Sequence, residues 1–294
     1  MNQNKRSITK KIAYGPLCPV FSLSWAVFAS VQRLLFRAKW KLKGLPMPTD
    51  DEIKLMRENV TFIFKSFERK SSAKRLYRSI QKYYPGVKVI IADDSKKPLM
   101  LKSEHVKVVH LPFNSGLSKG LNKALALVDT PFAIRMDDDQ VLTPYTTFHK
   151  HLQFLRSHSE LDLISVFQYT ASAPLSWQSK IKPYFKETMD EAPKPLKIPH
   201  GTFLDKSYVV MGKVPNVFVA RTEKFREVGY DDNIRMTDHL EFFFRAAGVL
   251  ASALALDSFV LHYHNPFNKK YKKFRGDIAG DCTYIKNKHP LYFE

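Results

Sequence analysis

Residues 113–142 read FNSGLSKGLNKALALVDTPFAIRMDDDQVL, and this stretch decides the fold. An Asn-Ser-Gly loop comes first and is followed by a helical pattern over about 118–128. The apolar run 131–136 then has the length and composition of a buried strand. Three consecutive carboxylates, Asp137–Asp139, follow that strand directly. This order of loop, helix, strand and acidic turn predicts an α/β domain with polar chemistry at the carboxyl end of the strand.

The sequence on both sides continues the same alternation. Thr49 and Glu52 form the pattern of a capping box for a short helix through Glu58. Strands and helices then alternate in a way that predicts a mostly parallel sheet with helices on both faces. We expect strands at 60–64, 87–92, 105–111, 131–136 and 161–167, and helices at about 71–84, 118–128 and 145–157. Ligands of such sheets bind where strands end, so the residues directly after each strand are the candidates for function.

Two of the expected strands end in acidic clusters. The strand 87–92 is followed by Asp93 and Asp94, and the strand 131–136 by Asp137–Asp139. Adjacent carboxylates repel one another, and a divalent metal bridging a diphosphate would compensate them, with oxygen ligands that suit Mg²⁺ or Mn²⁺. The alternative is a solvated acidic turn. The sequence has no P-loop, no GxGxxG after a strand and no HExxH, so kinases, dehydrogenases and zincins find no support.

Three segments together resemble a known family. Residues 60–95, 113–142 and 214–246 resemble the opening, the DxD region and the acceptor half of a family 2-type glycosyltransferase with the GT-A (Rossmann-like) fold. The "ADDS", "MDDD" and "DHLEFF" segments are similar to those of the ganglioside-type β1,4-N-acetylgalactosaminyltransferase group. The resemblance covers roughly residues 58–265. It implies an inverting transfer of a sugar from a UDP-sugar to a glycolipid or lipid-linked saccharide.

The resemblance also implies roles for single residues. Asp93 would accept a hydrogen bond from uracil, and Asp138 would touch the ribose or the sugar. Asp137 and Asp139 would form the DxD pair that holds Mn²⁺ or Mg²⁺. The remaining nucleotide-sugar contacts would come from Ser66, Phe67, Glu68, Asn114, Gly116 and Lys119. Two positions depart from the family pattern: Gln140 replaces a further acid, and Lys65-Ser66 replaces Pro-Thr/Ser, which puts the ribose contacts in doubt.

The general base and a further metal ligand are expected late in the chain. Asp238 and Glu241 lie three residues apart at a predicted helix start, so both carboxylates could reach one cleft. Either could take the proton of the acceptor hydroxyl, with Asp238 preferred. The alternative is a capping Asp and a surface Glu. His262 or His264, after a strand-like run, fits the position of a late metal-binding histidine, although a lone histidine is usually structural.

Charge and the N-terminal sequence point to a membrane surface. Lys and Arg number 47 against 28 Asp and Glu, a net charge of +19 that suits nucleic acid or anionic lipid. No nucleic-acid-binding motif is found, so nucleic acid is the weaker partner. Read as a helix, the stretch 17–36 separates a stripe with Arg33 and Arg37 from an apolar side, as in helices that lie in a membrane interface. The alternatives are a spanning helix, or one that packs its apolar face on the protein's own core.

These features give three regions and a location. We expect a basic amphipathic membrane-associating segment at 1–45, a GT-A domain at 46–266 and a basic segment at 267–294. Cys18 and Cys282 show no metal-ligand spacing, and a reducing compartment is favoured. The expected location is therefore the cytoplasmic face of a bacterial inner membrane, with a Golgi membrane as the alternative. The alternative function is a basic nucleic-acid- or membrane-binding protein on an inactive GT-A scaffold.

Overall fold

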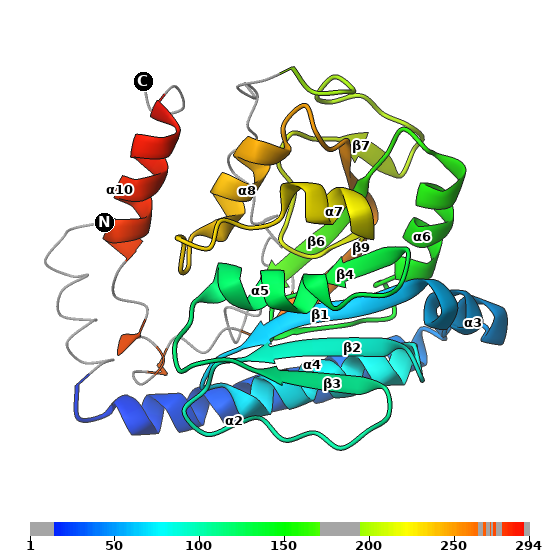
Figure 1. Ribbon diagram of the computed structural model, residues 1–294. Helices are drawn as coiled ribbons and strands as arrows, with labels where there is room; N and C mark the ends of the chain where they lie inside the picture. The colour runs from blue at the N-terminus through cyan, green and yellow to red at the C-terminus, as the bar shows by residue number, and fades with distance from the viewer. Residues whose placement is uncertain are drawn as a thin grey trace, which may run out of the picture.

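The computed structural model describes residues 15–170, 195–263, 267–268, 271, 273–274 and 278–290. Helices and strands alternate along most of this length (Figure 1). The helices are α2 (Cys18–Leu42), α3 (Asp50–Asn59), α4 (Lys70–Tyr83), α5 (Leu117–Ala126), α6 (Phe148–Ser157), α7 (Thr222–Val228), α8 (Asp238–Ala246) and α10 (Ile278–Lys288). The strands are β1 (Val60–Ser66), β2 (Lys88–Asp93), β3 (Val106–His110), β4 (Phe132–Arg135), β5 (Gln140–Val141), β6 (Leu163–Thr170), β7 (Tyr208–Val210), β8 (Phe218–Arg221) and β9 (Ser252–His262).

One nine-stranded sheet, in the order β3-β2-β1-β4-β8-β6-β9-β5 with β7 beside β9, runs through the molecule. Its first half, β3-β2-β1-β4, is parallel, as the sequence predicted. Beyond β4 the sheet is mixed, because β8 enters antiparallel to both β4 and β6. β6 and β9 are parallel, whereas β5 and β7 pair with β9 in the antiparallel sense. The expectation of a mostly parallel sheet therefore holds only for the half that contains β1 to β4.

The core lies on both faces of this sheet. In β1, Phe62 and Phe64 pack on the side of α3, α4 and α6, and Ile63 packs on the side of α5, α7 and α8. This alternation follows from the two-residue period of a strand. Each fully buried aromatic or aliphatic side chain contributes about 1.5–3 kcal/mol relative to exposure. Phe242–Phe244 of α8 also belong to the core, since all three are buried.

Helix α3 leads the chain into the sheet and begins as the sequence predicted. The Thr49 side chain accepts from the backbone N–H of Glu52 at 3.3 Å. The Glu52 carboxylate in turn accepts from the backbone N–H of Thr49 at 2.8 Å. This capping box satisfies two N–H groups that would otherwise have no partner at the helix start. Residue 60 then follows directly as the first residue of β1, so the cap also fixes where the sheet begins.

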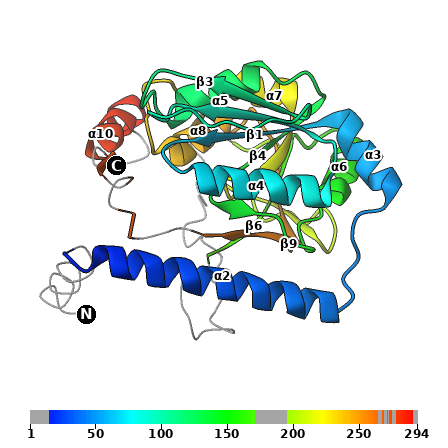
Figure 2. The same cartoon turned by 90° about the horizontal axis from the view of Figure 1, so that it is seen from below.

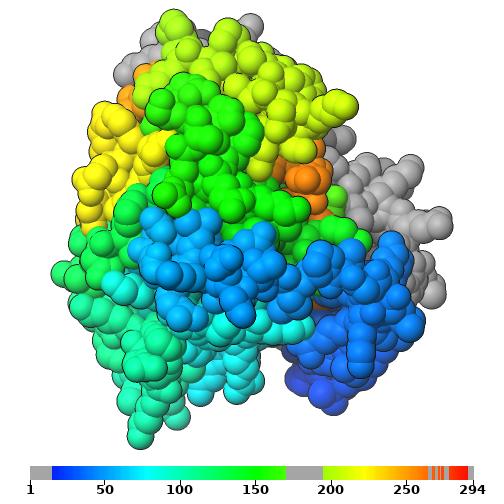
Figure 3. Space-filling model, turned by 90° about the vertical axis from the view of Figure 1, so that its right-hand side faces the viewer, coloured from blue at the N-terminus to red at the C-terminus, as the bar shows by residue number. Residues whose placement is uncertain are grey.

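The N-terminal helix α2 lies outside the helix layers (Figure 2; dark blue in Figure 3). Only Cys18 and Ala29 of its residues are buried. Its apolar side faces outward, and the exposed side chains are Val20, Leu23, Val27, Val31 and Leu34. The alternative in which this apolar side packs on the protein's own core is therefore wrong. Among the described residues, α2 is also the one helix long and apolar enough to cross a membrane.

Candidate active site

A cavity of about 460 Å³ lies at the carboxyl ends of β1 and β4, within the size range of ligand pockets. The three carboxylates after β4 line it together with Asp238, the first residue of α8. The cavity is also lined by His262, the last residue of β9, and by Asn114 and Gly116 in front of α5. The fold thus brings the acidic turn, the Asn-x-Gly loop and the start of α8 into one site.

Two arginines from the protein compensate the three carboxylates. Arg69, in front of α4, donates from Nη1 to Asp139 Oδ2 at 2.6 Å and forms a second ion pair with Asp138. Arg135, the last residue of β4, places Nη2 3.0 Å from Asp137 Oδ1 and 3.5 Å from Asp238 Oδ2. The acidic turn is therefore not a solvated one, because Asp138 and Asp139 are buried. A metal is not required to relieve their repulsion, which corrects the premise drawn from the sequence.

The ion pairs set the protonation of this cluster. Burial raises the pKa of Asp138, against the pull of Arg69, and the charges of Asp139 and Asp137 raise it further. Burial opposes the charge of Arg69 and of Arg135, but the neighbouring carboxylates outweigh it and raise the pKa of both guanidinium groups. Both arginines are therefore permanent cations within the cavity wall.

A metal ion would find oxygen and nitrogen donors at the β9 side of the cavity. Asp139 Oδ1 lies 3.2 Å from His262 Nε2. Burial opposes protonation of this imidazole, yet Asp139 outweighs it and the pKa of His262 is raised. No three His, Cys, Asp or Glu side chains among the described residues gather closely enough to hold a metal by themselves. The donor set fits a hard divalent cation that takes its other ligands from a bound phosphate. His264 lies outside the described residues.

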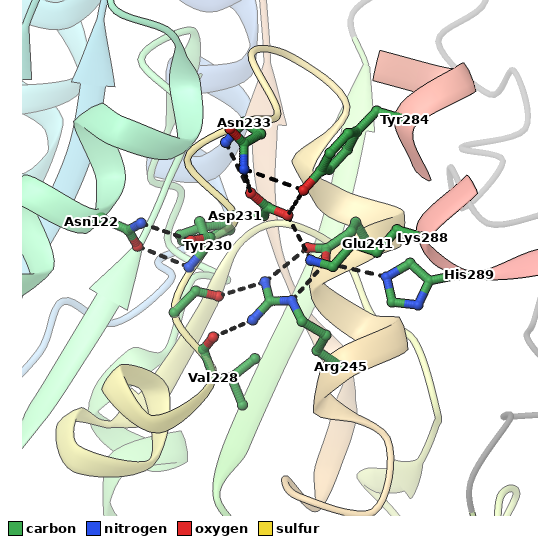
Figure 4. A network of polar contacts seen from close by, with 11 residues as sticks. Asn122, Val228, Tyr230, Asp231, Asn233, Glu241, Arg245, Tyr284, Lys288 and His289 are labelled. Carbon is green, nitrogen blue, oxygen red and sulfur yellow. Dashed lines mark hydrogen bonds and ion pairs between the residues drawn. The ribbon is translucent and has the colours of Figure 1, made fainter. Parts of the chain in front are cut away.

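Asp238 and Glu241 do not share the cavity. Asp238 is buried at the head of α8 and faces the cavity, where the helix dipole favours its anionic form. Glu241 is held instead by Arg245, with contacts of 2.6 and 2.8 Å, and by Lys288 of α10 at 2.8 Å (Figure 4). It does not line the cavity. The expectation that both carboxylates reach one cleft is therefore wrong, because α10 and the i+4 arginine draw Glu241 to the opposite side.

The loop in front of α8 is fixed by the C-terminal helix α10. The Asp281 carboxylate accepts from the backbone N–H groups of Arg235, Met236 and Thr237 at 3.1, 2.7 and 3.0 Å. It also accepts from the Thr237 hydroxyl at 3.1 Å. Asp281 thus supplies the acceptors that a helix start needs, although it lies more than forty residues downstream. The position of Asp238 consequently depends on α10.

Only half of the residues expected to contact the nucleotide-sugar line the cavity. Phe67, Asn114, Gly116 and Asp138 line the cavity. Gly116 has φ +104, and a Cβ there would lie 3.4 Å from the backbone of Arg235. The remaining four, Ser66, Glu68, Asp93 and Lys119, do not line it. Asp93 accepts from Ser95 Oγ at 2.7 Å and from the backbone N–H of Leu99 at 2.6 Å, so both its oxygens are used within the protein.

Sequence reasoning missed the cationic residues of the site. Lys65, Arg69, Arg135 and Arg235 all line the cavity. Lys65 pairs with the buried Asp94 at 2.7 Å, where burial opposes both charges by raising the pKa of Asp94 and lowering that of Lys65. Arg135 could have been found from the sequence, because an arginine inside an otherwise apolar buried strand needs a carboxylate partner. Arg69 could not have been found in this way, since it lies in a basic run of the sequence.

A model described as "Glycosyl transferase family 2" matches residues 61–208. The chain belongs to glycosyl transferase family 2. The matched part begins in β1, includes the acidic turn and the Asn-x-Gly loop, and ends in β7. The GT-A-like α/β fold implied by the resemblance is thereby confirmed.

Curated relatives and a solved structure agree with this. The chain is 33% identical over 247 residues to β-1,4 N-acetylgalactosaminyltransferase 1 of Mus musculus, covering 80% of this chain and 46% of that protein. It is 32% identical over 199 residues to β-1,4 N-acetylgalactosaminyltransferase 2 of the same species, covering 66% and 37%. The chain thus spans about half or less of these relatives' length. A crystal structure of S. aureus TarS 1–349 shares the fold at a TM-score of 0.51 and 17% identity, covering 69% of this chain and 60% of that one.

Proposed function

We propose that the protein is an inverting glycosyltransferase that moves a sugar from a UDP-sugar to a hydroxyl of a glycolipid or lipid-linked saccharide. The observation that carries the proposal is Arg135, which contacts Asp137 of the acidic turn and Asp238 of α8 within one cavity. Solved structures of TarS contain UDP or UDP-GlcNAc, and the mouse relatives are named as N-acetylgalactosaminyltransferases. These names support a UDP-activated N-acetylhexosamine as the donor class.

The donor would bind on the β1 and α5 side of the cavity. Phe67 offers an aromatic face beside Phe113 and Phe274, with ring centroids 5.6 and 5.3 Å away, which suits stacking of a planar base. Gly116 lets a diphosphate approach the start of α5 closely, where backbone N–H groups favour an anion. Lys65 and Arg69 add cationic side chains to the same wall. Asp138 would orient the ribose or the sugar.

Asp139 and His262, with Asp137, would hold Mn²⁺ or Mg²⁺. When bound, the ion supplies charge that stabilises the UDP leaving group. Arg69 holds Asp139 through Oδ2, so Oδ1, which lies beside His262, would be the oxygen that the cation takes. Arg69 would also offer positive charge to the phosphate oxygens, a role that guanidinium groups serve well.

Asp238 would act as the general base. The acceptor oxygen forms a bond to C1 of the sugar while the bond from C1 to the β-phosphate oxygen breaks. The acceptor proton passes to Asp238, and the product sugar has the opposite anomeric configuration. Arg135 contacts both Asp137 and Asp238 and would hold the base in a fixed position relative to the acidic turn. This division of roles places donor and acceptor on opposite sides of the β4 terminus.

We also propose that the protein works at an anionic membrane surface, on the cytoplasmic face of a bacterial inner membrane. The exposed apolar side of α2 and the net charge of +19 support this placement. An acceptor carried by lipid would then reach the cavity from the membrane. The proposed side of the membrane is supported by the small number of cysteines and the strong positive charge.

A donor screen tests the proposal. UDP-sugars are added to the full chain with Mn²⁺, with Mg²⁺ or with EDTA, and both thermal protection and release of UDP are measured. We expect protection and metal-dependent hydrolysis for at least one UDP-N-acetylhexosamine. Protection without hydrolysis or transfer would indicate an inactive GT-A scaffold, and no protection by any UDP compound would reject the proposed donor.

A further inference from the structure

A second cavity lies between α2 and α4, about 280 Å³ in volume. Five cationic side chains line it, and no Asp or Glu is among its lining residues. α2 contributes Arg33 and Arg37, and α4 contributes Arg75, Arg78 and Lys82. In Figure 2, α2 runs along the lower edge of the molecule and α4 lies above it. Cations from both helices therefore line one open cavity.

Within the described part of the chain, Arg33 and Arg75 have no carboxylate within ion-pair distance. Arg33 Nη2 donates to Ser30 Oγ at 2.7 Å, and Arg75 Nη2 donates to Ser72 Oγ at 3.3 Å. Both guanidinium groups also lie over the ring of Tyr263, 5.0 and 5.5 Å from its centroid. Burial and then the charge of Arg33 lower the pKa of Arg75, against the pull of Asp139 and Asp138. Two partly desolvated like charges in this position would be stabilised by an anion.

The surroundings of this basic cluster are apolar. Phe36 and Trp40 stack at 5.5 Å and line the cavity with Leu261 and Tyr263. On its other side, α2 presents the exposed apolar row already described. An occupant that uses the whole lining combines a compact anion, held by the arginines, with hydrocarbon that packs on Phe36 and Trp40. A free inorganic anion would use the arginines only.

We propose that this cavity binds the phosphate head group of a membrane lipid. Arg33 and Arg75 donate to the phosphate oxygens, in the forked geometry that guanidinium groups offer. Arg37, Arg78 and Lys82 surround the group, and the acyl chains leave the cavity past Phe36 and Trp40.

The cavity also has a connection toward the active site. A neighbouring cavity of about 580 Å³ shares Arg33, Arg75 and Tyr263 with it, and shares Arg69 and Tyr271 with the active-site cavity. A lipid phosphate bound by α2 and α4 would hold the membrane surface beside this passage.

The test uses a monomeric lipid, so that general attraction to a charged membrane does not contribute. Full-length protein is titrated with dihexanoyl phosphatidylglycerol below its micelle concentration, and affinity is measured by calorimetry. We expect saturable one-to-one binding that R33Q/R75Q weakens at least tenfold. K39Q/K41Q removes the same charge from exposed positions of α2 outside the cavity and should change affinity by less than about threefold. Equal losses in both double variants, or no binding by the parent protein, would overturn the proposal.

Two further measurements separate the remaining outcomes. R33K/R75K keeps both positive charges but loses the forked guanidinium geometry, so we expect its affinity for the lipid to lie between those of the parent and R33Q/R75Q. Circular dichroism checks that each variant is folded. If R33Q/R75Q does not fold, the lysine variant decides, and parent-like affinity in it would reject the forked contact. Inorganic phosphate should bind at least tenfold more weakly than the lipid. Equal affinity would make this a free-anion site and reject the lipid.

Discussion

Arg135 occupies a position where a charged side chain is costly. It ends the buried strand β4, its side chain is fully buried, and its partners Asp137 and Asp238 come from different parts of the chain. Removing one member of a buried ion pair leaves the other charges uncompensated, which is more damaging than replacing the whole group. Arg135 therefore links the proposed catalytic carboxylates with the stability of the fold at a single residue.

Replacing Arg135 should affect both properties. We expect R135M to lower the free energy of unfolding by about 3 kcal/mol, the lower end for a broken buried pair, and to abolish transfer. R135K keeps a charge without the fork and should lose less on both measurements. Urea unfolding and steady-state transfer assays provide the two values. An R135M protein with parent-like stability would show that Asp137 and Asp238 do not need this cation.

The two carboxylates of α8 should have different functions, and a matched pair of variants tests this. D238N should lower the transfer rate by at least about 10²-fold, the low end of general-base contributions, with UDP affinity near that of the parent. E241Q should keep transfer and lose stability, because Glu241 is bound by Arg245 and Lys288 outside the cavity. Transfer kinetics and UDP titration distinguish them. The reverse pattern would assign the base to Glu241.

Among the helices and strands, α10 is the element whose role could not be predicted from the sequence. Its role depends on side chains that meet across a long separation, such as Asp281 with Thr237, and local patterns contain no such information. β7 and β8 were missed for another reason: they are three and four residues long and, unlike the equally short β4, are not followed by an acidic turn that marks the strand end. By contrast, β1, β2, β3, β4 and α5 match their predicted ranges to within about two residues, since long apolar runs with Gly or Pro boundaries define them.

The candidate site shows the same division. The acidic turn, Asn114, Gly116 and Asp238 could be placed in advance, because they follow strands or start helices and resemble a family pattern. Lys65 and Arg69 could not, since their function comes from which carboxylates they reach in space. Glu241 was misplaced because helical spacing predicts on which face of the helix a side chain lies. It does not predict which residues from other elements contact that face.

The contacts of α10 with α8 should weaken in acid. Burial opposes the charge of Asp231, but hydrogen bonds from Lys288 and its neighbours lower the pKa of Asp231 to about 2. The pKa of Glu241 is also lowered, by Arg245 and Lys288 against burial. Folded-state pKa values below the unfolded ones mean that these carboxylates contribute fully above about pH 4 and lose their contribution as the pH falls toward 2.

This pH dependence can be tested with Lys288. The free energy of unfolding should fall between about pH 4 and about 2, and the fall should be shallower in K288M, which has lost the shared cation. At neutral pH, K288M should be less stable by about 1–3 kcal/mol, because Glu241 loses a charged hydrogen bond. Denaturant unfolding across this pH range gives both values. K286M, on the same helix but without these contacts in the network of Figure 4, is the control. Parallel pH profiles for the parent and K288M would contradict the assignment.

At the scale of the whole molecule, charge and exposed hydrocarbon lie together at the N-terminal helix. The net charge of +19 attracts anionic surfaces at long range, and the outward apolar side of α2 provides contact at short range. In Figure 3 this helix lies at the lower right of the molecule. The molecule therefore has one edge suited to a membrane.

Membrane attachment should be reversible if α2 lies in the interface. We expect the full chain to be released from anionic membranes by high salt or alkaline carbonate, because salt screens the attraction between exposed charges. Sedimentation of membranes before and after each wash measures the released fraction. Extraction by detergent alone would show that α2 spans the bilayer.

The contact between Asp281 and the loop before α8 can form only late in synthesis of the chain. The loop before α8 leaves the ribosome earlier than the carboxylate that holds it, and β9 is completed between them. A nascent chain that has reached the end of β9 can form every strand of the sheet. The loop that leads to Asp238, the proposed general base, is not fixed until α10 follows. A protein cut short after β9 should therefore fold and still be unable to transfer sugar. We therefore expect transfer activity to appear only once α10 has been synthesised.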